Sequence, residues 1–348
     1  MSALDQPLLI ANSNYHVGQQ IAIRVAEEQG YFRAEGFTNY KYEGRGLIPG
    51  PVEPEGLALA VKEHGLDIIT AVNVESIIFQ RSKGADLYIV SGWRYESNPD
   101  LKWHAAKGIK DLRGLRGRKI GTREPGDLTQ ISMFKALRMA GVDPEKEVHW
   151  VYDPIFAYRT NPAHAEMLRS GKVDAVASGP PFSEQLEKEG YGPVLDPKTK
   201  FPRGKLGKVI IATERTIERR RDELSAFLRA IIRAFWFMRD RDHFEYLRDL
   251  ELRLRRESRN DEERVVSLLS SPAKVEGWTL PIDLRVPQAD LEEAISDMVQ
   301  RGRLEQPLSV NDVVRDDLAV RAYKEVSGRA ELEPALSKAL AAVQKYGF

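Results

Sequence analysis

Three arginines follow predicted strands of the chain, at the ends where an open α/β sheet binds its ligands: Arg45, Arg94 and Arg123. Arginine presents a planar guanidinium group that holds a carboxylate or a sulfonate through two parallel hydrogen bonds. A hydrogen bond to a charged group contributes about 1.5–3 kcal/mol. The sequence therefore predicts a site for a small organic anion, which is an aromatic or small carboxylate or a sulfonate. The alternative for each arginine is a surface or hinge ion pair.

Other polar and aromatic side chains occupy the same predicted loops. Tyr15 and Trp93 offer rings that stack on an aromatic or apolar ligand body. The helix that begins near Leu128 offers free N–H groups and a positive dipole end to an anion. Asp127 precedes that helix, and helix capping is its favoured alternative role. The complete predicted set of ligand-binding residues is Asn14, Tyr15, His16, Arg45, Asn73, Trp93, Arg94, Thr122, Arg123, Asp127, Tyr152 and Ser178.

Sequence motifs for catalysis, metals and nucleotides are missing. The chain has no cysteine, which excludes disulfides, thiolate metal sites and cysteine nucleophiles. It contains no His-Glu-x-x-His pattern, no Walker A sequence and no Gly-x-Ser-x-Gly elbow. We therefore expect no metal and no cofactor. If the chain were an enzyme, His16 would transfer the proton, although a hydrogen bond to a bound ligand is its favoured role.

Short apolar runs alternate with amphipathic helices in the first part of the chain. This alternation predicts βαβ units and a mainly parallel sheet. The first helix ends just before Gly30, a residue type suited to the left-handed conformation that follows many helices. The predicted strands span residues 8–11, 37–42, 67–71 and 87–90, and the predicted helices span residues 17–29, 57–63 and 74–81.

The strand–helix pattern then restarts and predicts a second α/β unit. Its predicted strands span residues 118–122, 149–152 and 173–177, and its helices span residues 128–140 and 162–170. A strand at 208–213 returns the chain to the first unit. The prediction is an α/β fold of two lobes with a ligand cleft between them. Lobe 1 comprises residues 1–94 and 206–348, and lobe 2 comprises residues 95–205.

From Asp222 onward the sequence is mainly helical. Apolar residues recur with a 3.6-residue period between Leu224 and Met238, so one face of this helix is predicted to be buried. Asp222 is the predicted N-cap, and Phe235 is a predicted core residue. Further helices predicted at residues 261–269, 288–299 and 335–343 pack around lobe 1.

The overall composition is that of a soluble, core-forming protein. The chain has 348 residues, of which 42% are hydrophobic and 30% are charged, and its 52 basic and 52 acidic residues give no net charge. A nucleic-acid-binding chain usually has a basic excess, so we expect no nucleic-acid partner. We also expect no insertion into a membrane, because no apolar run approaches 18 residues. As written the chain predicts a cytoplasmic protein; a numbering that starts after a removed leader would make it periplasmic.

Four stretches of sequence, in the same order, resemble one known superfamily. They are Ala11–Phe37 (ANSNYHVGQQIAIRVAEEQGYFRAEGF), Gly108–Gly121 (GIKDLRGLRGRKIG), Met167–Ala177 (MLRSGKVDAVA) and Lys208–Phe235. Together they resemble the SsuA/THI5-like (NMT1-type) periplasmic-binding-protein superfamily over roughly residues 8–240. The resemblance implies a type II periplasmic-binding-protein fold, with two α/β lobes, a ligand cleft and C-terminal helices on lobe 1.

The resemblance leaves two functions open. Most members are solute-binding proteins of ABC importers for sulfonates, taurine, nitrate, thiamine precursors and aromatic carboxylates, with an ABC permease as partner. A minority are cytosolic enzymes that rely on cysteine-containing motifs, which this chain lacks. The favoured prediction is a solute-binding protein that closes two lobes over an organic anion. The alternative is a decarboxylase or related lyase acting on an aromatic acid, which the missing export signal supports.

Overall fold

The computed structural model divides the chain into two compact units, each with its own sheet and core. Unit 1 comprises Met1–Tyr95 and Leu206–Phe348, and unit 2 comprises Glu96–Lys205. The division predicted from the sequence places the first boundary one residue earlier. The residues that the structure describes are 6–13, 17–43, 56–96, 102–122, 128–153, 160–179, 182–196, 205–257, 283–330, 337 and 341.

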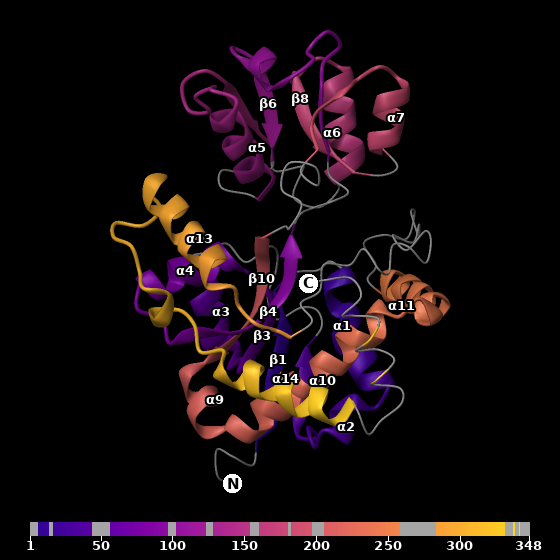
Figure 1. Cartoon of the computed structure of the whole chain (residues 1–348), viewed down its shortest axis with the longest axis vertical. Helices are drawn as coiled ribbons and strands as arrows, with labels where there is room; N and C mark the ends of the chain where they lie inside the picture. The colour runs from indigo at the N-terminus through magenta and orange to yellow at the C-terminus, as the bar shows by residue number, and fades with distance from the viewer. Residues whose placement is uncertain are drawn as a thin grey trace. The chain divides into compact units, whose positions relative to one another are not determined.

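Unit 1 contains a five-stranded mixed sheet in the order β2-β1-β3-β10-β4 (Figure 1). β1 pairs in parallel with both β2 and β3, whereas β10 runs antiparallel to β3. At the β4 edge Ile89 forms a parallel bridge with Val314, so the C-terminal part of the chain protects that edge strand from pairing elsewhere. The strands are β1 (Leu8–Asn12), β2 (Tyr40–Glu43), β3 (Ile68–Asn73), β4 (Leu87–Glu96) and β10 (Lys205–Thr213).

Helices cover one face of this sheet and form the larger core cluster of unit 1. The apolar stripe of α10 lies at the centre of this cluster, with Phe227, Phe235 and Trp236 each at most 1% exposed. The ring of Trp236 meets the ring of Tyr323 of α14 edge to face. The helices of this face are α1 (Val17–Glu28), α2 (Tyr31–Ala34), α10 (Arg221–Arg239), α11 (Phe244–Glu257) and α14 (Asp317–Ala330).

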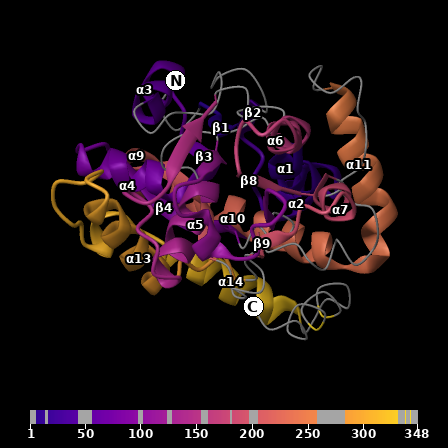
Figure 2. The same ribbon diagram turned by 90° about the horizontal axis from the view of Figure 1, so that it is seen from above.

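A second set of helices covers the opposite face of the same sheet. Leu57, Ile77 and Leu291 from three helices pack with Ile69 and Val209 from the sheet. Figure 2 shows α3 and α4 on one side of the unit 1 strands and α1 and α11 on the other. The helices of the second face are α3 (Leu57–His64), α4 (Val74–Ser82) and α13 (Gln288–Gln300); the other helical elements of the unit are α9 (Glu214–Arg219), η4 (Arg241–His243) and η5 (Val310–Asp312).

Unit 2 repeats this design with a five-stranded sheet in the order β7-β6-β8-β5-β9. β6 is parallel to β7 and β8, and β5 is antiparallel to β8 and β9. Figure 1 shows α5 on one side of the sheet and α6 and α7 on the other, matching two separate apolar clusters. The elements are β5 (Lys102–Ala105), β6 (Lys119–Thr122), β7 (His149–Tyr152), β8 (Ala175–Ser178), β9 (Pro193–Leu195), α5 (Leu128–Met139), α6 (Thr160–Arg169), α7 (Phe182–Lys188) and η2 (Leu112–Leu115).

Most predicted strands and helices are present within two or three residues of the predicted bounds. Gly30 (φ 71°) and Gly141 (φ 75°) adopt the left-handed conformation predicted after the helices α1 and α5. Phe235 is fully buried, as predicted. The predicted helix at 261–269 lies outside the described residues, and of 335–343 only residues 337 and 341 are described.

Several details of the predicted fold are wrong. β4 continues to Glu96 instead of ending at Val90. β5 and the helices α11 and α14 were not predicted. The N-cap of α10 is Arg220, and Asp222 lies in the first helical turn, where its charge still favours the positive end of the helix dipole.

A buried carboxylate ties three helices of unit 1 together. The side chain of Glu35, at the end of α2, is 1% exposed and accepts hydrogen bonds from Arg229 (2.8 Å), Arg233 (2.9 Å) and Arg329 (2.9 Å). Burial alone would raise the pKa of Glu35, but the hydrogen bonds from Arg329, Arg229 and Arg233 hold it below its ordinary value. The C-terminal helix α14 is thereby fastened to α2 and α10.

We predict that Glu35→Gln lowers the free energy of unfolding by about 3–5 kcal/mol, because three guanidinium groups then lose their shared counter-charge. Since the folded-state pKa is depressed, the stabilisation is present above the ordinary value of 4.5 and disappears as the pH falls below it. Urea denaturation between pH 3 and 7, followed by tryptophan fluorescence, measures both effects. Glu325→Gln is the control, since the side chain of Glu325 is 35% exposed and its pair with Arg229 contributes below about 1 kcal/mol. Equal losses in the two variants would contradict the prediction.

Candidate functional site

Three predicted ligand residues lie together at the carboxyl edge of the unit 2 sheet. Thr122, Tyr152 and Ser178 are the last residues of β6, β7 and β8. These three strands are parallel, so their carboxyl ends meet at one edge, and Thr122 is the register partner of Tyr152. This edge is where open α/β sheets bind ligands, as the sequence analysis assumed.

The phenol of Tyr152 is positioned by a residue that sequence reasoning missed. Tyr152 is 42% exposed, and its hydroxyl accepts a hydrogen bond from Nε2 of Gln130 at 2.7 Å. Gln130, in the first turn of α5, is 5% exposed, so burial holds the donor in place. Thr122, on the same strand edge, is 2% exposed. The signal available in the sequence was a glutamine at the start of a helix that follows a strand.

Ser178 carries a buried hydroxyl with no hydrogen-bond partner among the described residues. Its residue exposure is 0%, and its Oγ makes no hydrogen bond to any residue that the structure describes. A buried polar group left unpaired costs about 1–3 kcal/mol. Such groups are rare in folded proteins and need a reason. Ser178 ends a β-strand at the edge where open α/β sheets bind ligands, so its hydroxyl is available to a bound molecule.

His164 orients the peptide that precedes Ser178. Nδ1 of His164 lies 2.8 Å from the carbonyl oxygen of Ala177, and His164 is 7% exposed. Because a carbonyl oxygen only accepts, Nδ1 must carry the proton in this bond. The sequence analysis did not include His164 in the site, although its place near the start of the helix that precedes β8 points to this edge.

In each unit a lysine of the antiparallel strand lies at the carboxyl edge of the sheet. Lys102 of β5 is the register partner of Ser178, and Lys208 of β10 is the register partner of Asn73 at the end of β3. The Lys102 ammonium group lies 2.9 Å from Glu187. Their hydrogen bond raises the pKa of Lys102 and lowers that of Glu187. A lysine at the amino end of a reverse strand was missed because β5 was not predicted.

The carboxyl edge of unit 1 contains a strained bulge. Opposite the two-residue step from Val209 to Ile211, β3 takes a three-residue step from Val72 to Ile69, which is a β-bulge. Within it Ala71 has φ 59°, a left-handed conformation that costs a residue other than glycine about 1–2 kcal/mol. The carbonyl oxygen of Ala71 accepts a hydrogen bond from Oγ of Ser13 at 2.5 Å.

The same edge places Asn73 beside a lysine. Asn73 occupies the N-cap position of α4 but makes no side-chain capping bond. Its amide oxygen instead accepts a hydrogen bond from the Lys208 ammonium group. The start of α4 therefore keeps N–H groups that Asn73 does not cap, next to a cationic side chain.

The prediction that Trp93 binds the ligand is wrong. Its indole is 2% exposed and packs edge to face on Phe235, with ring centres 5.2 Å apart. The prediction placed Trp93 in a loop because it ended β4 at Val90, whereas the strand continues and turns this side chain into the core. Arg94 lies in the same strand, and its side chain is outside the description. The other predicted residues outside the described part of the chain are Asn14, Tyr15, His16, Arg45, Arg123 and Asp127.

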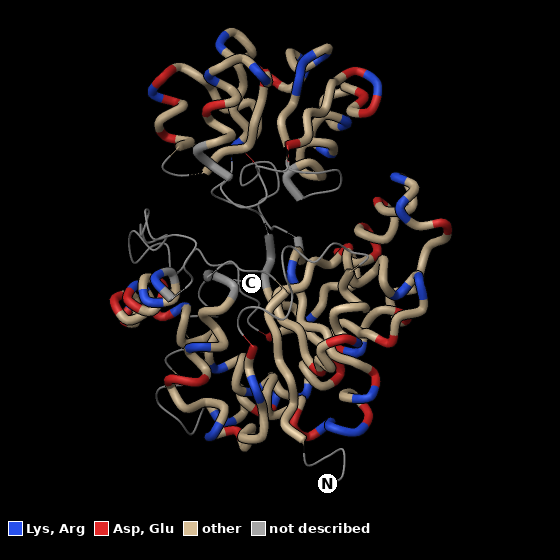
Figure 3. Tube along the Cα trace, turned by 180° about the vertical axis from the view of Figure 1, so that it is seen from behind, with Lys and Arg blue, Asp and Glu red and all other residues tan. Residues whose placement is uncertain are grey.

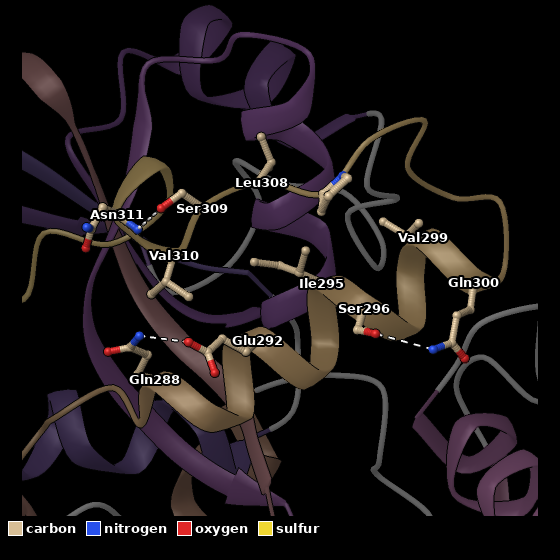
Figure 4. A pocket seen from close by; sticks show the side chains of 11 residues that line it. Gln288, Glu292, Ile295, Ser296, Val299, Gln300, Leu308, Ser309, Val310 and Asn311 are labelled. Carbon is tan, nitrogen blue, oxygen red and sulfur yellow. Dashed lines mark hydrogen bonds between the residues drawn. The ribbon is translucent and has the colours of Figure 1, made fainter.

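Two surface pockets of unit 1 lie away from all the predicted ligand residues. One, of about 470 Å³, runs between α13 and residues 307–311 (Figure 4). Four of its polar side chains are bonded to one another within α13, Gln288 to Glu292 at 2.7 Å and Gln300 to Ser296 at 3.3 Å. The second, of about 640 Å³, lies between α3 and α9. No lining residue of either pocket has a buried polar atom without a hydrogen-bond partner, so neither pocket replaces the strand edges as the candidate site.

Two further properties of the described residues bear on function. No group of three or more histidine, aspartate or glutamate side chains among them is arranged to hold a metal ion. Within the same part of the chain, no helix has the length and apolar character needed to cross a membrane.

The two units and their mixed sheets define the class of protein. Each unit combines parallel strands with an antiparallel strand, β10 or β5, and covers both faces with helices, and this is the periplasmic-binding-protein fold of two α/β lobes. The model of the NMT1/THI5-like family matches residues 18–242, about two thirds of the chain. The chain belongs to the NMT1/THI5-like family, as the sequence resemblance predicted.

Solved structures agree with this assignment at low sequence identity. The putative sulfonate-binding protein SsuA of Methylobacillus flagellatus KT superposes with a TM-score of 0.65 at 15% identity, covering 93% of this chain and 96% of that chain. The aliphatic sulphonate-binding protein SsuA of Escherichia coli gives 0.63 at 16% identity, over 89% and 92%. The desulfurization enzyme DszB gives 0.61 at 14% identity, over 91% and 99%. No curated protein sequence matches the chain. At these identities the similarity shows the fold alone.

We predict that Ser178→Ala leaves the unliganded protein as stable as the parent or more stable, by up to about 1 kcal/mol, because the substitution removes an unpaired buried hydroxyl. Ser91→Ala is the matched control. Ser91 is also fully buried, but its hydroxyl donates to the carbonyl oxygen of Gly92 at 2.6 Å. The control is expected to lose about 1 kcal/mol in thermal and urea unfolding. A larger loss for Ser178→Ala than for Ser91→Ala would refute the assignment.

Proposed function

We propose that the chain binds a small organic anion, a carboxylate or a sulfonate, as the solute-binding protein of an ABC-type importer. Family membership and fold support solute binding in general. The observation that carries the proposal is the buried hydroxyl of Ser178, unpaired at the ligand edge of unit 2. A serine hydroxyl donates to one oxygen of a carboxylate or sulfonate, and a bond to a charged acceptor is about twice as strong as one between neutral groups.

The charge at the strand ends supports an anionic ligand. Lys208 lies at the carboxyl edge of the unit 1 sheet, and the uncapped start of α4 adds a positive dipole end beside it. Lys102 lies at the carboxyl edge of the unit 2 sheet, where Glu187 balances its charge. Arg45, Arg94 and Arg123 remain the predicted bidentate partners of the anion. The names of the two SsuA proteins, which bind sulfonates, favour the same class of ligand.

Gln130 and His164 have positioning roles in this proposal. Gln130 fixes the hydroxyl of Tyr152, which then forms a further hydrogen bond to the ligand. His164 fixes the carbonyl of Ala177 and thereby the direction of the Ser178 side chain. Ordering these groups before the ligand arrives reduces the entropy lost on binding. The permease of the importer is the protein partner, and the site of action is outside the cytoplasm.

A cytosolic enzyme on the same scaffold is the second candidate, favoured by the similarity to DszB. A cysteine-to-serine variant of DszB has been solved with biphenyl-2-sulfinic acid. This chain has no cysteine, so it cannot share a cysteine nucleophile. An enzyme here would be a decarboxylase or related lyase of an aromatic acid, with His16 as the proton-transfer group. Incubating the protein with each tightly bound acid and following product by mass spectrometry separates the two candidates, because a binding protein returns its ligand unchanged.

We predict that isothermal titration with a panel of sulfonates and of aliphatic and aromatic carboxylates identifies at least one ligand of micromolar or better affinity. Arg45→Ala and Arg94→Ala are each expected to weaken its binding at least about tenfold, since each removes a charge-assisted contact. Arg321→Ala is the control. The side chain of Arg321 is 66% exposed, and it pairs with Glu325 on the surface of α14.

Ser178→Ala is the second arm of the same titration. The proposal expects this variant to bind the ligand about tenfold more weakly while keeping the stability of the parent, because the hydroxyl serves only the bound state. Unchanged affinity in both arginine variants and in Ser178→Ala would rule out the proposed site.

A further inference from the structure

The amino edge of the unit 2 sheet, opposite the ligand edge, carries an excess of exposed cationic side chains. Seven exposed lysines and arginines lie where β6 and β8 begin and β5 ends, beside the acidic residues Asp111, Glu147 and Asp174. Asp143 and Glu145, in the turn before β7, pair with Lys146 and Arg138 instead. Figure 3 shows Lys and Arg segments around the start of β6. This set, called the basic edge below, comprises Lys107, Lys110, Arg113, Arg116, Arg118, Lys119 and Lys172.

Backbone hydrogen bonds make the basic edge one continuous surface. The N–H of Asp174 donates to the carbonyl of Lys119 at 2.7 Å, and the N–H of Ala106 donates to the carbonyl of Asp174 at 2.7 Å. The turn before β6 is joined to the turn before β7 through Gly117 and Glu147 at 2.6 Å. The cations therefore come from two chain segments, residues 107–119 and the turn that contains Lys172, which the sheet holds side by side.

The three acids of this edge serve the protein's own backbone and arginines. Asp111 accepts from the N–H of Gly114 at 3.0 Å, and Asp174 accepts from the N–H of Lys119 at 2.9 Å. Glu147 accepts from a backbone N–H and from Arg116, and these hydrogen bonds hold its pKa below the ordinary value. These carboxylates are partly exposed but already occupied, and Asp174 also lies 3.9 Å from Arg118, so the cations outnumber them on this edge.

The cationic side chains of the basic edge that form no bond to the described residues are mainly lysines. Lys110, Lys119 and Lys172 are exposed and form no ion pair among the described residues. By contrast, Arg113 and Arg116 donate to the carbonyl oxygens of Ala140 and Gly141. A lysine ammonium group is a point charge on a flexible side chain and lacks the planar geometry by which arginine binds one carboxylate or phosphate bidentately. These lysines therefore suit a surface whose negative charges are distributed over many groups.

An exposed apolar side chain lies beside these cations. Met139, the last residue of α5, is 59% exposed, the highest value among the large exposed hydrophobic residues of the described chain. The arginine contacts to Ala140 and Gly141 place Arg113 and Arg116 next to it. An exposed apolar side chain flanked by two arginines combines the apolar and cationic contacts that peripheral proteins make with a lipid headgroup layer.

We propose that the basic edge of unit 2 adsorbs to a membrane surface rich in anionic lipid headgroups, with Met139 entering the headgroup layer. The attraction is electrostatic, and the chain does not insert. The ligand edge stays free, because Lys119 and Thr122 are the opposite ends of the same strand β6. A nucleic acid would supply negative charge too, but it offers no apolar layer for Met139.

Cosedimentation with vesicles tests the proposal. The full chain is mixed, in 50 mM salt, with vesicles of phosphatidylcholine alone or with 30% phosphatidylglycerol. It should sediment only with the anionic vesicles, and 0.5 M salt should release it. Each lysine near an anionic surface adds about fivefold to binding, so Lys110→Ala/Lys119→Ala/Lys172→Ala should lower the partition coefficient on the order of a hundredfold. Met139→Ser should lower it severalfold at unchanged charge.

The matched control is Lys62→Ala/Lys83→Ala/Lys324→Ala, which removes the same charge from exposed positions of unit 1. It should bind anionic vesicles within about threefold of the parent. Equal losses in the two triple variants, or sedimentation with phosphatidylcholine alone, would overturn the proposal. So would failure to bind vesicles combined with salt-sensitive binding of duplex DNA, which would assign the edge to nucleic acid. Ligand titration of the first triple variant separates this test from the proposed anion site, whose affinity should not change.

Discussion

Both sheets of this protein bury both of their faces, and this leaves only the strand ends for polar chemistry. In unit 1 the sheet lies between two apolar clusters, and in unit 2 it lies between two others. A charged side chain inside such a cluster requires a full set of partners, as Glu35 has in its three arginines. Because parallel strands share a direction, one edge collects their last residues and the opposite edge collects their first. The candidate ligand site and the basic edge are these two edges.

Periodicity in the sequence predicted most elements because each strand or helix buries a face with a regular spacing of apolar residues. It failed where the period did not change at the boundary. The prediction ended β4 at Val90, but the alternation of side chains continues through Ser91 and Trp93. The sequence therefore contains no signal that the strand stops at Val90. The error moved Trp93 from the core, where it packs on Phe235, into an imagined ligand loop. Aromatic type alone does not distinguish these two positions.

The sequence predicted the residues of the candidate site only on strands whose direction it also predicted. The rule that ligands lie at carboxyl ends placed Thr122, Tyr152 and Ser178 together, because all three follow parallel strands. Lys102 and Lys208 reach the same kind of edge from the opposite direction, on strands that pair antiparallel. Direction is a property of long-range pairing, which a four-residue strand such as β5 does not encode in its own sequence.

The two carboxyl edges also break local rules of structure in ways that the amino edge does not. In unit 1 Ala71 holds a left-handed conformation where glycine would be free of strain, and in unit 2 Ser178 buries an unpaired hydroxyl. Each costs about 1 kcal/mol or more, a substantial share of the stability of a domain. At the amino edge of unit 2 the left-handed turns use Gly117 and Gly171. Leu284 is left-handed as well (φ 57°), so these costs agree with the strand-end rule but do not locate the candidate edge by themselves.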